Sequence, residues 1–220
     1  LSLYDVLILP DSSSRFSREI GRAAPIQEFV REGGVLVAIS GSVDMLAGES
    51  YKLLSTKREN AAVSDDDASG GADDGEGSRA PGTVLESDED YQALIRDTEA
   101  RPEDVPGVLV KAVADPDHWL SAGYDTANVL VTGGDIYRPL NAADGANVFR
   151  FANADDLLLS GYLWEENQAQ LAFKPFVMAE RQGDGLVVGF TQSPVTRAYL
   201  NGLNLLMANA VLLGPARVAQ

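Results

Sequence analysis

Apolar residues recur along the chain in two patterns, as short unbroken runs and as longer segments with helical spacing. The runs at 4–9 and 35–39 have the length and composition of strands that are buried on both faces of a sheet. Between them, residues 15–31 carry apolar side chains at helical spacing, with Pro25 placed to open the second half of the helix. This succession of strand, helix and strand predicts a right-handed βαβ unit.

The second of these strands leads into a turn of small residues. Residues 33–47 read GGVLVAISGSVDMLA, in which Ser40, Gly41 and Ser42 separate the apolar run from a segment with helical spacing. Such a connection points backbone N–H groups at the space outside the carboxyl end of the strand, where open α/β sheets bind ligands and place nucleophiles. These three residues are therefore the first candidates for a binding or catalytic site.

Strand patterns return after residue 102. Gly183-Asp184-Gly185 predicts a tight hairpin turn, and the strand over 169–178 is expected at a sheet edge because it contains Pro175. The apolar segment 199–213 predicts a final helix with most of its surface buried. The strands predicted in this part of the chain are 108–113, 129–131, 147–151, 169–178 and 186–190.

The distribution of charge sets residues 57–102 apart from the rest of the predicted fold. The chain of 220 residues has 17 basic and 33 acidic side chains, a formal net charge of −16. Ten of the acids but one base, Arg79, lie between Ser64 and Asp90, in a stretch that buries too little apolar surface to offset its chain entropy. We predict a single domain over 1–220, with 57–102 an acidic, largely flexible insertion. The alternative of a calcium-binding loop lacks the EF-hand spacing.

Composition also excludes several kinds of partner. The acidic balance opposes nucleic acids and anionic membrane surfaces, and no apolar run reaches the roughly 18 residues that a membrane-spanning helix needs. The chain has no cysteine and one histidine, His118, so thiolate sites and zinc sites built on two or three histidines are excluded. We expect no metal and no cofactor in this chain. Because it opens at Leu1 and almost at once enters a strand, we expect it to be a piece of a longer polypeptide.

Ser40 and His118 are the candidate catalytic residues. A serine hydroxyl becomes a nucleophile only when a general base within hydrogen-bond reach takes its proton. His118 lies in DPDHWLSAGY, a sequence typical of a turn before a strand, which favours a capping role. Asp44 is expected to complement the dipole of the first helical turn after the elbow. The structural alternative for Ser40 is a small residue that lets the backbone pack tightly.

The elbow sequence AISGSVDMLA and the late loop FTQSPVT, in this order of elements, resemble the class I glutamine amidotransferase-like fold. In that family a cysteine occupies the elbow, and a His-Pro-Glu motif follows a late strand. Here Ser40 stands at the nucleophile position, while Ser193, Pro194 and Val195 stand where His, Pro and Glu would be. The resemblance implies an α/β, flavodoxin-like three-layer sandwich with a mostly parallel sheet and a degenerate active site.

A second resemblance rests on residues of the last third of the chain. They are Leu159-Ser160-Gly161-Tyr162, the segment Gly183–Phe190, Arg197, Gly202, Leu205, Asn209-Ala210 and Leu213-Gly214-Pro215. This pattern is similar to the C-terminal amidotransferase-like domain of bacterial zinc carboxypeptidase-like proteins, which have a carboxypeptidase A-like catalytic domain. The resemblance implies that zinc and its His-x-x-Glu ligands belong to an upstream peptidase domain of the same polypeptide, and that the protein is secreted or periplasmic.

We therefore expect a non-catalytic accessory domain that orients or helps to bind the substrate of such a peptidase domain. A homo-oligomer is the other partnership that the sequence allows. Two alternatives stay open. One is a serine-dependent hydrolase that uses Ser40. The other is a small-anion binding module built from the elbow N–H groups with Ser193 and Arg197, whose planar guanidinium would hold a carboxylate or phosphate unless it pairs within the chain.

Overall fold

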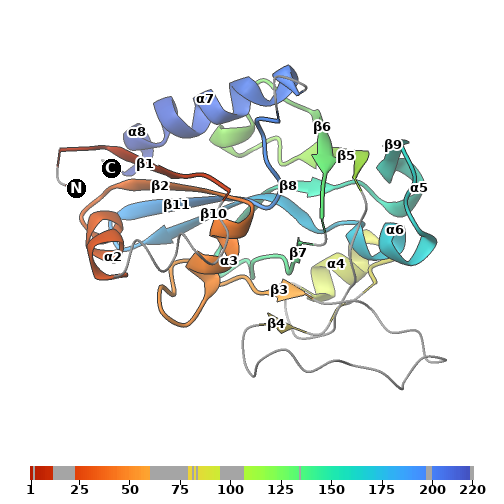
Figure 1. Cartoon of the computed structure of the whole chain (residues 1–220), viewed down its shortest axis with the longest axis horizontal. Helices are drawn as coiled ribbons and strands as arrows, with labels where there is room; N and C mark the ends of the chain where they lie inside the picture. Colours follow the sequence, from red (N-terminus) through yellow and green to blue (C-terminus); the bar gives the residue numbers. More distant parts are fainter. Residues whose placement is uncertain are drawn as a thin grey trace.

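The protein is an α/β domain with helices on both faces of a central sheet (Figure 1). The computed structural model describes residues 1, 3–11, 23–59, 79–80, 82, 84–94, 107–133, 135–196 and 200–218. The strands are β1 (Val6–Leu9), β2 (Val35–Ile39), β3 (Arg58–Glu59), β4 (Arg79–Ala80), β5 (Val108–Ala114), β6 (Thr126–Val131), β7 (Ile136–Tyr137), β8 (Gly145–Phe151), β9 (Leu158–Ser160), β10 (Pro175–Gln182) and β11 (Gly185–Phe190). The helices are α2 (Ala24–Arg31), α3 (Gly41–Ala47), α4 (Asp88–Leu94), α5 (Ala154–Leu157), α6 (Glu165–Leu171), α7 (Asn204–Leu213) and α8 (Pro215–Val218), with 3-10 turns η1 (Trp119–Ser121) and η2 (Asn201–Leu203).

The main sheet mixes parallel and antiparallel strands. Its order is β1-β2-β11-β10-β8-β5-β6, with β9 paired to β5. β2 is parallel to both of its neighbours, β1 and β11, whereas every pair from β11 to β6 is antiparallel. The prediction of a mostly parallel sheet is therefore wrong. Tight reversals such as the one at Gly183 and Asp184 join antiparallel strands, while a parallel pair needs a long crossover.

All five residues of β2 are buried, as its apolar run predicts. Val35, Val37 and Ile39 belong to the core between the sheet and α7. Leu36 and Ala38 belong to the core on the other face, against α2 and α3. Because successive side chains of a strand point to opposite faces, a strand covered by helices on both sides needs apolar residues throughout. The predicted buried strand before the elbow is confirmed.

Two strands occupy positions opposite to those predicted. β1, which we expected to be buried, forms an edge of the main sheet and leaves Ile8 exposed. β10, which we expected at an edge, lies in the centre between β8 and β11. Pro175 is the first residue of β10, a position where the missing N–H is tolerated. Residues 169–171 of the predicted strand instead end α6.

The terminal helices also differ from their predictions. α7 buries one stripe, formed by Leu206, Asn209 and Ala210, and leaves Leu205 and Leu212 exposed. The prediction that most of its surface is buried is therefore wrong. α2 begins at Ala24, with proline in its first turn, and the preceding part of the predicted helix lies outside the described residues. Within the described residues, no helix combines the length and the apolar character needed to cross a membrane.

The insertion predicted over 57–102 is described only in part. β3 pairs in parallel with β4 and antiparallel with β7, forming a second, small sheet. Leu85 and Tyr91 are buried against Ala172 and Phe173, so α4 packs on the region around α6. The flexibility expected of the insertion falls mainly on residues outside the described ones.

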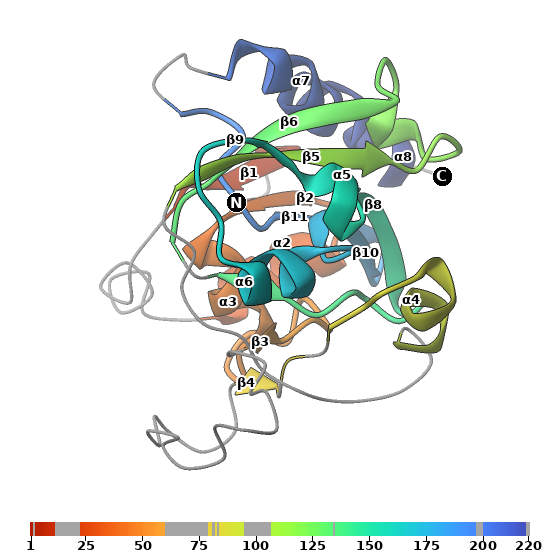
Figure 2. The same cartoon turned by 90° about the vertical axis from the view of Figure 1, so that its right-hand side faces the viewer.

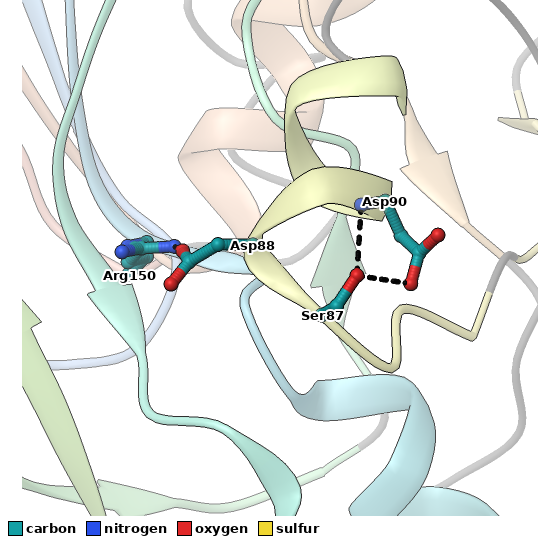
Figure 3. A network of polar contacts seen from close by, with 4 residues as sticks. All are labelled: Ser87, Asp88, Asp90 and Arg150. Carbon is teal, nitrogen blue, oxygen red and sulfur yellow. Dashed lines mark hydrogen bonds and ion pairs between the residues drawn. The ribbon is translucent and has the colours of Figure 1, made fainter.

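The first turn of α4 is fixed by polar contacts (Figure 3). The N–H of Asp90 donates to Ser87 Oγ at 3.1 Å, and this hydroxyl donates to Asp90 Oδ2 at 2.7 Å. Asp88 pairs with Arg150 of β8. The serine caps the helix, and the ion pair ties α4 to the main sheet.

Candidate functional site

Ser40 lies at the sharp turn between β2 and α3. Its backbone has φ 51° and ψ −120°, a left-handed conformation that costs a non-glycine residue on the order of 1–3 kcal/mol. Its N–H donates to the carbonyl of Phe190 at 2.7 Å, so the neighbouring strand β11 holds the turn in place. This is the strained strand-to-helix geometry that presents a nucleophile above a sheet.

The two residues after Ser40 are tied to the end of β1. Ser42 is fully buried, and its hydroxyl donates to the carbonyl of Pro10 at 2.7 Å. The N–H of Gly41 donates to Asp11 Oδ1 at 3.2 Å. A carboxylate of the chain itself therefore satisfies an N–H at the start of α3 that an anionic ligand would otherwise use.

The loop after β11 lies at the same end of the sheet as the elbow. β11 and β2 are parallel, and Phe190 is paired with Ile39. The structure thus brings Ser193 to the elbow end of the sheet, as the amidotransferase resemblance implies. Its hydroxyl accepts a hydrogen bond from the N–H of Val195 at 3.4 Å, within its own loop.

Two buried polar residues of this loop hold backbone segments together. Thr191 Oγ1 donates to the carbonyl of Pro175 at 2.9 Å. The side-chain amide of Gln192 accepts from the N–H of Thr132 and donates to the carbonyl of Asp135, both at 3.2 Å. These groups stabilise the loop, and neither is an acid–base residue at neutral pH.

His118 lies in a different part of the fold. β11, β10 and β8 stand between β2 and β5 in the sheet, and β5 runs opposite to β2, so the ends of these two strands point in opposite directions. The N–H of Leu120 donates to His118 Nδ1 at 3.2 Å, which caps η1. Burial lowers the pKa of His118. The structure therefore does not bring His118 to Ser40.

The remaining predicted site residues add no acid–base pair. Among the described residues, no hydrogen bond reaches the hydroxyl of Ser40. Asp44 lies in the first turn of α3, the position expected for a residue that complements the helix dipole. Arg197 lies outside the described residues, so its predicted role stays a prediction. The part of the chain that the structure describes holds no group of three or more His, Asp or Glu side chains placed to bind a metal ion.

A buried ion pair was not foreseen from the sequence. Lys174 Nζ donates to Glu59 Oε1 at 2.8 Å and to Oε2 at 2.6 Å, and the two side chains are 0% and 1% exposed. Burial lowers the pKa of Lys174, while the charge of Glu59 acts in the opposite direction. The pair joins β3 to the residue before β10. The sequence around each residue does not predict this contact, because the two residues lie 115 positions apart.

A shallow hollow of about 550 Å³ lies between the β5–β6 hairpin and η2. Tyr124 crosses it, since its hydroxyl donates to the carbonyl of Gly202 at 2.6 Å and accepts from the N–H of Leu206 at 3.1 Å. Its other lining residues are Leu109, Thr126, Ala127, Asn128, Leu200, Asn201 and Leu203. The hollow is beside β6, at the sheet edge farthest from β1, so it is separate from the elbow.

The mixed sheet, the helices on both faces and the elbow define an α/β domain. No known protein-family model matches the chain, and no curated protein matches it either. A ThuA-like protein from Parabacteroides merdae matches 100% of the chain and 73% of its own length, with 12% identity and a TM-score of 0.52. A cytoplasmic protein from Salmonella typhimurium matches 96% of the chain and 72% of its own length, with 13% identity and a TM-score of 0.51.

A glutamine amidotransferase from Thermotoga maritima matches 99% of the chain and 77% of its own length, with 15% identity and a TM-score of 0.44. At such identities these likenesses concern the fold alone. The ThuA-like protein and the Salmonella protein, with TM-scores of 0.52 and 0.51, support the predicted α/β class of the fold. None of these matches concerns a zinc carboxypeptidase.

Proposed function

We propose that this chain is a non-catalytic accessory domain of a larger enzyme, in which the amidotransferase-like elbow survives as a scaffold. The observation that carries the proposal is the strained elbow at Ser40, with Ser193 in the loop that follows β11 at the same end of the sheet. The amidotransferase resemblance implies a histidine at the position of Ser193. Among the described residues no general base is hydrogen-bonded to the Ser40 hydroxyl, and a serine hydroxyl that keeps its proton is a weak nucleophile.

The backbone around the elbow supports the same proposal. An acyl-transfer site needs N–H groups aimed at the oxygen that becomes negative in the transition state. At the start of α3, the N–H of Gly41 is already bonded to the carboxylate of Asp11. Both the small-anion alternative and the hydrolase alternative would require Asp11 to leave this position.

We further propose that the enzyme served by this domain is zinc carboxypeptidase-like and that its zinc is bound in a separate catalytic domain. This part rests on the sequence resemblance at 159–162, 183–190 and 202–215. The sequence encoded upstream of Leu1 tests it, since a His-x-x-Glu motif followed by a later histidine is expected there. A natural polypeptide without that motif would contradict the parent enzyme but not the accessory role.

The non-catalytic role is tested by assaying the purified chain with glutamine, activated esters and peptide amides. We expect turnover equal to the buffer rate, with no change in a Ser40→Ala variant. Ser160→Ala, an exposed serine on β9, is the matched control. Turnover that Ser40→Ala abolishes and Ser160→Ala preserves would contradict the proposal and establish the serine hydrolase.

A further inference from the structure

A cluster of exposed apolar side chains lies at the end of the molecule formed by β9 and the segment before α6. We call Leu158, Leu159, Tyr162 and Trp164 the aromatic patch. Tyr162 is 61% and Trp164 54% exposed, yet their rings contact each other edge to face, with centroids 4.9 Å apart and planes at 88°. An ordered aromatic pair in solvent, beside two exposed leucines, is typical of a surface that binds another molecule.

The backbone under the aromatic patch is fixed. β9 pairs antiparallel with β5, with Ser160 opposite Leu109. Gly161 has φ +99°, and a Cβ at this position would come within 3.3 Å of Val108 Cγ1. Leu163, between the two aromatic residues, is buried in the main core. The rings are therefore presented on a turn that the sheet and the core hold in place, which lowers the entropy cost of binding.

Acidic residues flank the aromatic patch along the chain on both sides. Asp155 and Asp156 lie in the first turn of α5, and Glu165 and Glu166 lie in the first turn of α6. All four are exposed, and residues 153–166 contain no lysine, arginine or histidine. β9, α5 and α6 face the viewer together in Figure 2. The surface is therefore apolar and aromatic at its centre, with negative charge around it.

We propose that the aromatic patch is a docking surface for a protein partner that presents arginine or lysine beside apolar side chains. Tyrosine and tryptophan are the usual anchors of protein interfaces, and their ring faces attract guanidinium and ammonium groups. The surrounding carboxylates favour a basic partner and steer its approach.

The same charges exclude other occupants. A second copy of this chain would bring like carboxylates against one another, at a cost of several kcal/mol. Nucleic acids and anionic lipids meet the same repulsion. The docking surface is the one through which this domain would contact its enzyme. The identity of the partner therefore rests on the proposed accessory role.

The test is calorimetric titration of the 220-residue chain with a short capped peptide of alternating arginine and leucine at physiological ionic strength. We expect binding that Trp164→Ala weakens about tenfold or more, the loss typical of an aromatic anchor. Tyr4→Ala is the matched control. Tyr4 is 66% exposed and lies near the N-terminus, which Figure 1 marks at the end opposite to β9. A double Glu165→Gln, Glu166→Gln variant is expected to bind more weakly and with less salt dependence.

Several outcomes would overturn the docking surface. They are an absence of binding, equal binding of a peptide with glutamine in place of arginine, and equal losses in Trp164→Ala and Tyr4→Ala, which would indicate attraction to acidic chain in general. A dimer in sedimentation that Trp164→Ala dissociates would assign the patch to self-association instead. Any of these results combined with blank hydrolase assays would refute the docking surface alone. Turnover that depends on Ser40 would refute the accessory role alone.

Discussion

Lys174 and Glu59 form an ion pair in the interior of the protein. Each is almost inaccessible to water, and the ammonium contacts both carboxylate oxygens. Removal of one partner leaves the other charge unpaired in the interior, at a cost of about 3–5 kcal/mol. We predict that Lys174→Met lowers the free energy of unfolding by about 3 kcal/mol or more, measured by urea denaturation.

The control for this prediction is the double variant Lys174→Met with Glu59→Leu. Replacing a buried ion pair with apolar side chains of similar size is often neutral or stabilising, so the second change is expected to recover much of the loss. Equal destabilisation of the single and double variants would mean that lost packing, rather than an unpaired carboxylate, accounts for the lower free energy of unfolding.

His118 is the one histidine of the chain, so its titration can be followed without overlap from another imidazole. Its pKa lies below 6.5 because burial disfavours the charged ring. Because the pKa of the folded state lies below that of the unfolded state, the contribution of His118 to the free energy of unfolding is fully present above pH 6.5. It is lost as the pH falls from there through the pKa of the folded state. We predict one histidine NMR signal with a pKa below 6.5, and a greater loss of stability on acidification than in His118→Gln. A pKa at or above the ordinary value would contradict the buried cap.

At the residue scale, sequence patterns predict what is local. The elbow at Ser40 follows from an apolar run, small residues and a helical segment that are adjacent in the chain. The partners of Gly41, Gln192 and Lys174 could not be predicted, because each contact joins distant segments that share no spacing or periodicity. Nor could the sequence show that His118 lies far from Ser40, because this separation depends on the order of the strands in the sheet.

At the scale of elements, the β10–β11 hairpin and α2 meet through a glycine. A Cβ on Gly185 would lie 1.9 Å from the carbonyl oxygen of Val30 and 2.7 Å from that of Gly34. Both neighbours are backbone atoms, so the hairpin would have to move away from α2. We predict that Gly185→Ala lowers the free energy of unfolding by about 2 kcal/mol or more.

Gly202→Ala is the matched control for the hairpin prediction. A Cβ at Gly202 would meet nothing within 4 Å, so its effect is expected to stay within about 0.5 kcal/mol. Thermal and urea unfolding of the two variants provide the comparison. Similar stability of both variants would show that the hairpin and α2 accommodate a methyl group without separating.

Strand existence was predicted better than strand position. The apolar runs identify β2, β5, β8 and β11 because residue type and length reflect burial directly. Periodicity does not state which strand lies beside which, so β1 and β10 exchanged their expected edge and central places. The proline rule misled because the first residue of a strand is exempt from it.

At the scale of the whole molecule, the elbow and the aromatic patch lie at the same end of the sheet. The elbow and the loop after β11 lie at one end, where the side chains of Thr191 and Gln192 are bonded to backbone carbonyls. The aromatic patch lies at this end as well, because β9 is paired with the first residues of β5. The class of fold was predictable from the order of elements, whereas the exposed aromatic pair was not, because exposure depends on how the chain is folded around it.

The pairing of β2 with β11 has a consequence for synthesis of the protein. The N–H of Ser40 is held by the carbonyl of Phe190, so the elbow cannot close until the chain as far as Phe190 has left the ribosome. Contacts between segments so distant in sequence form slowly. In the interval the apolar strand VLVAI has one open edge, to which other chains can add. We therefore expect this early strand to be prone to aggregation until the last hairpin is complete.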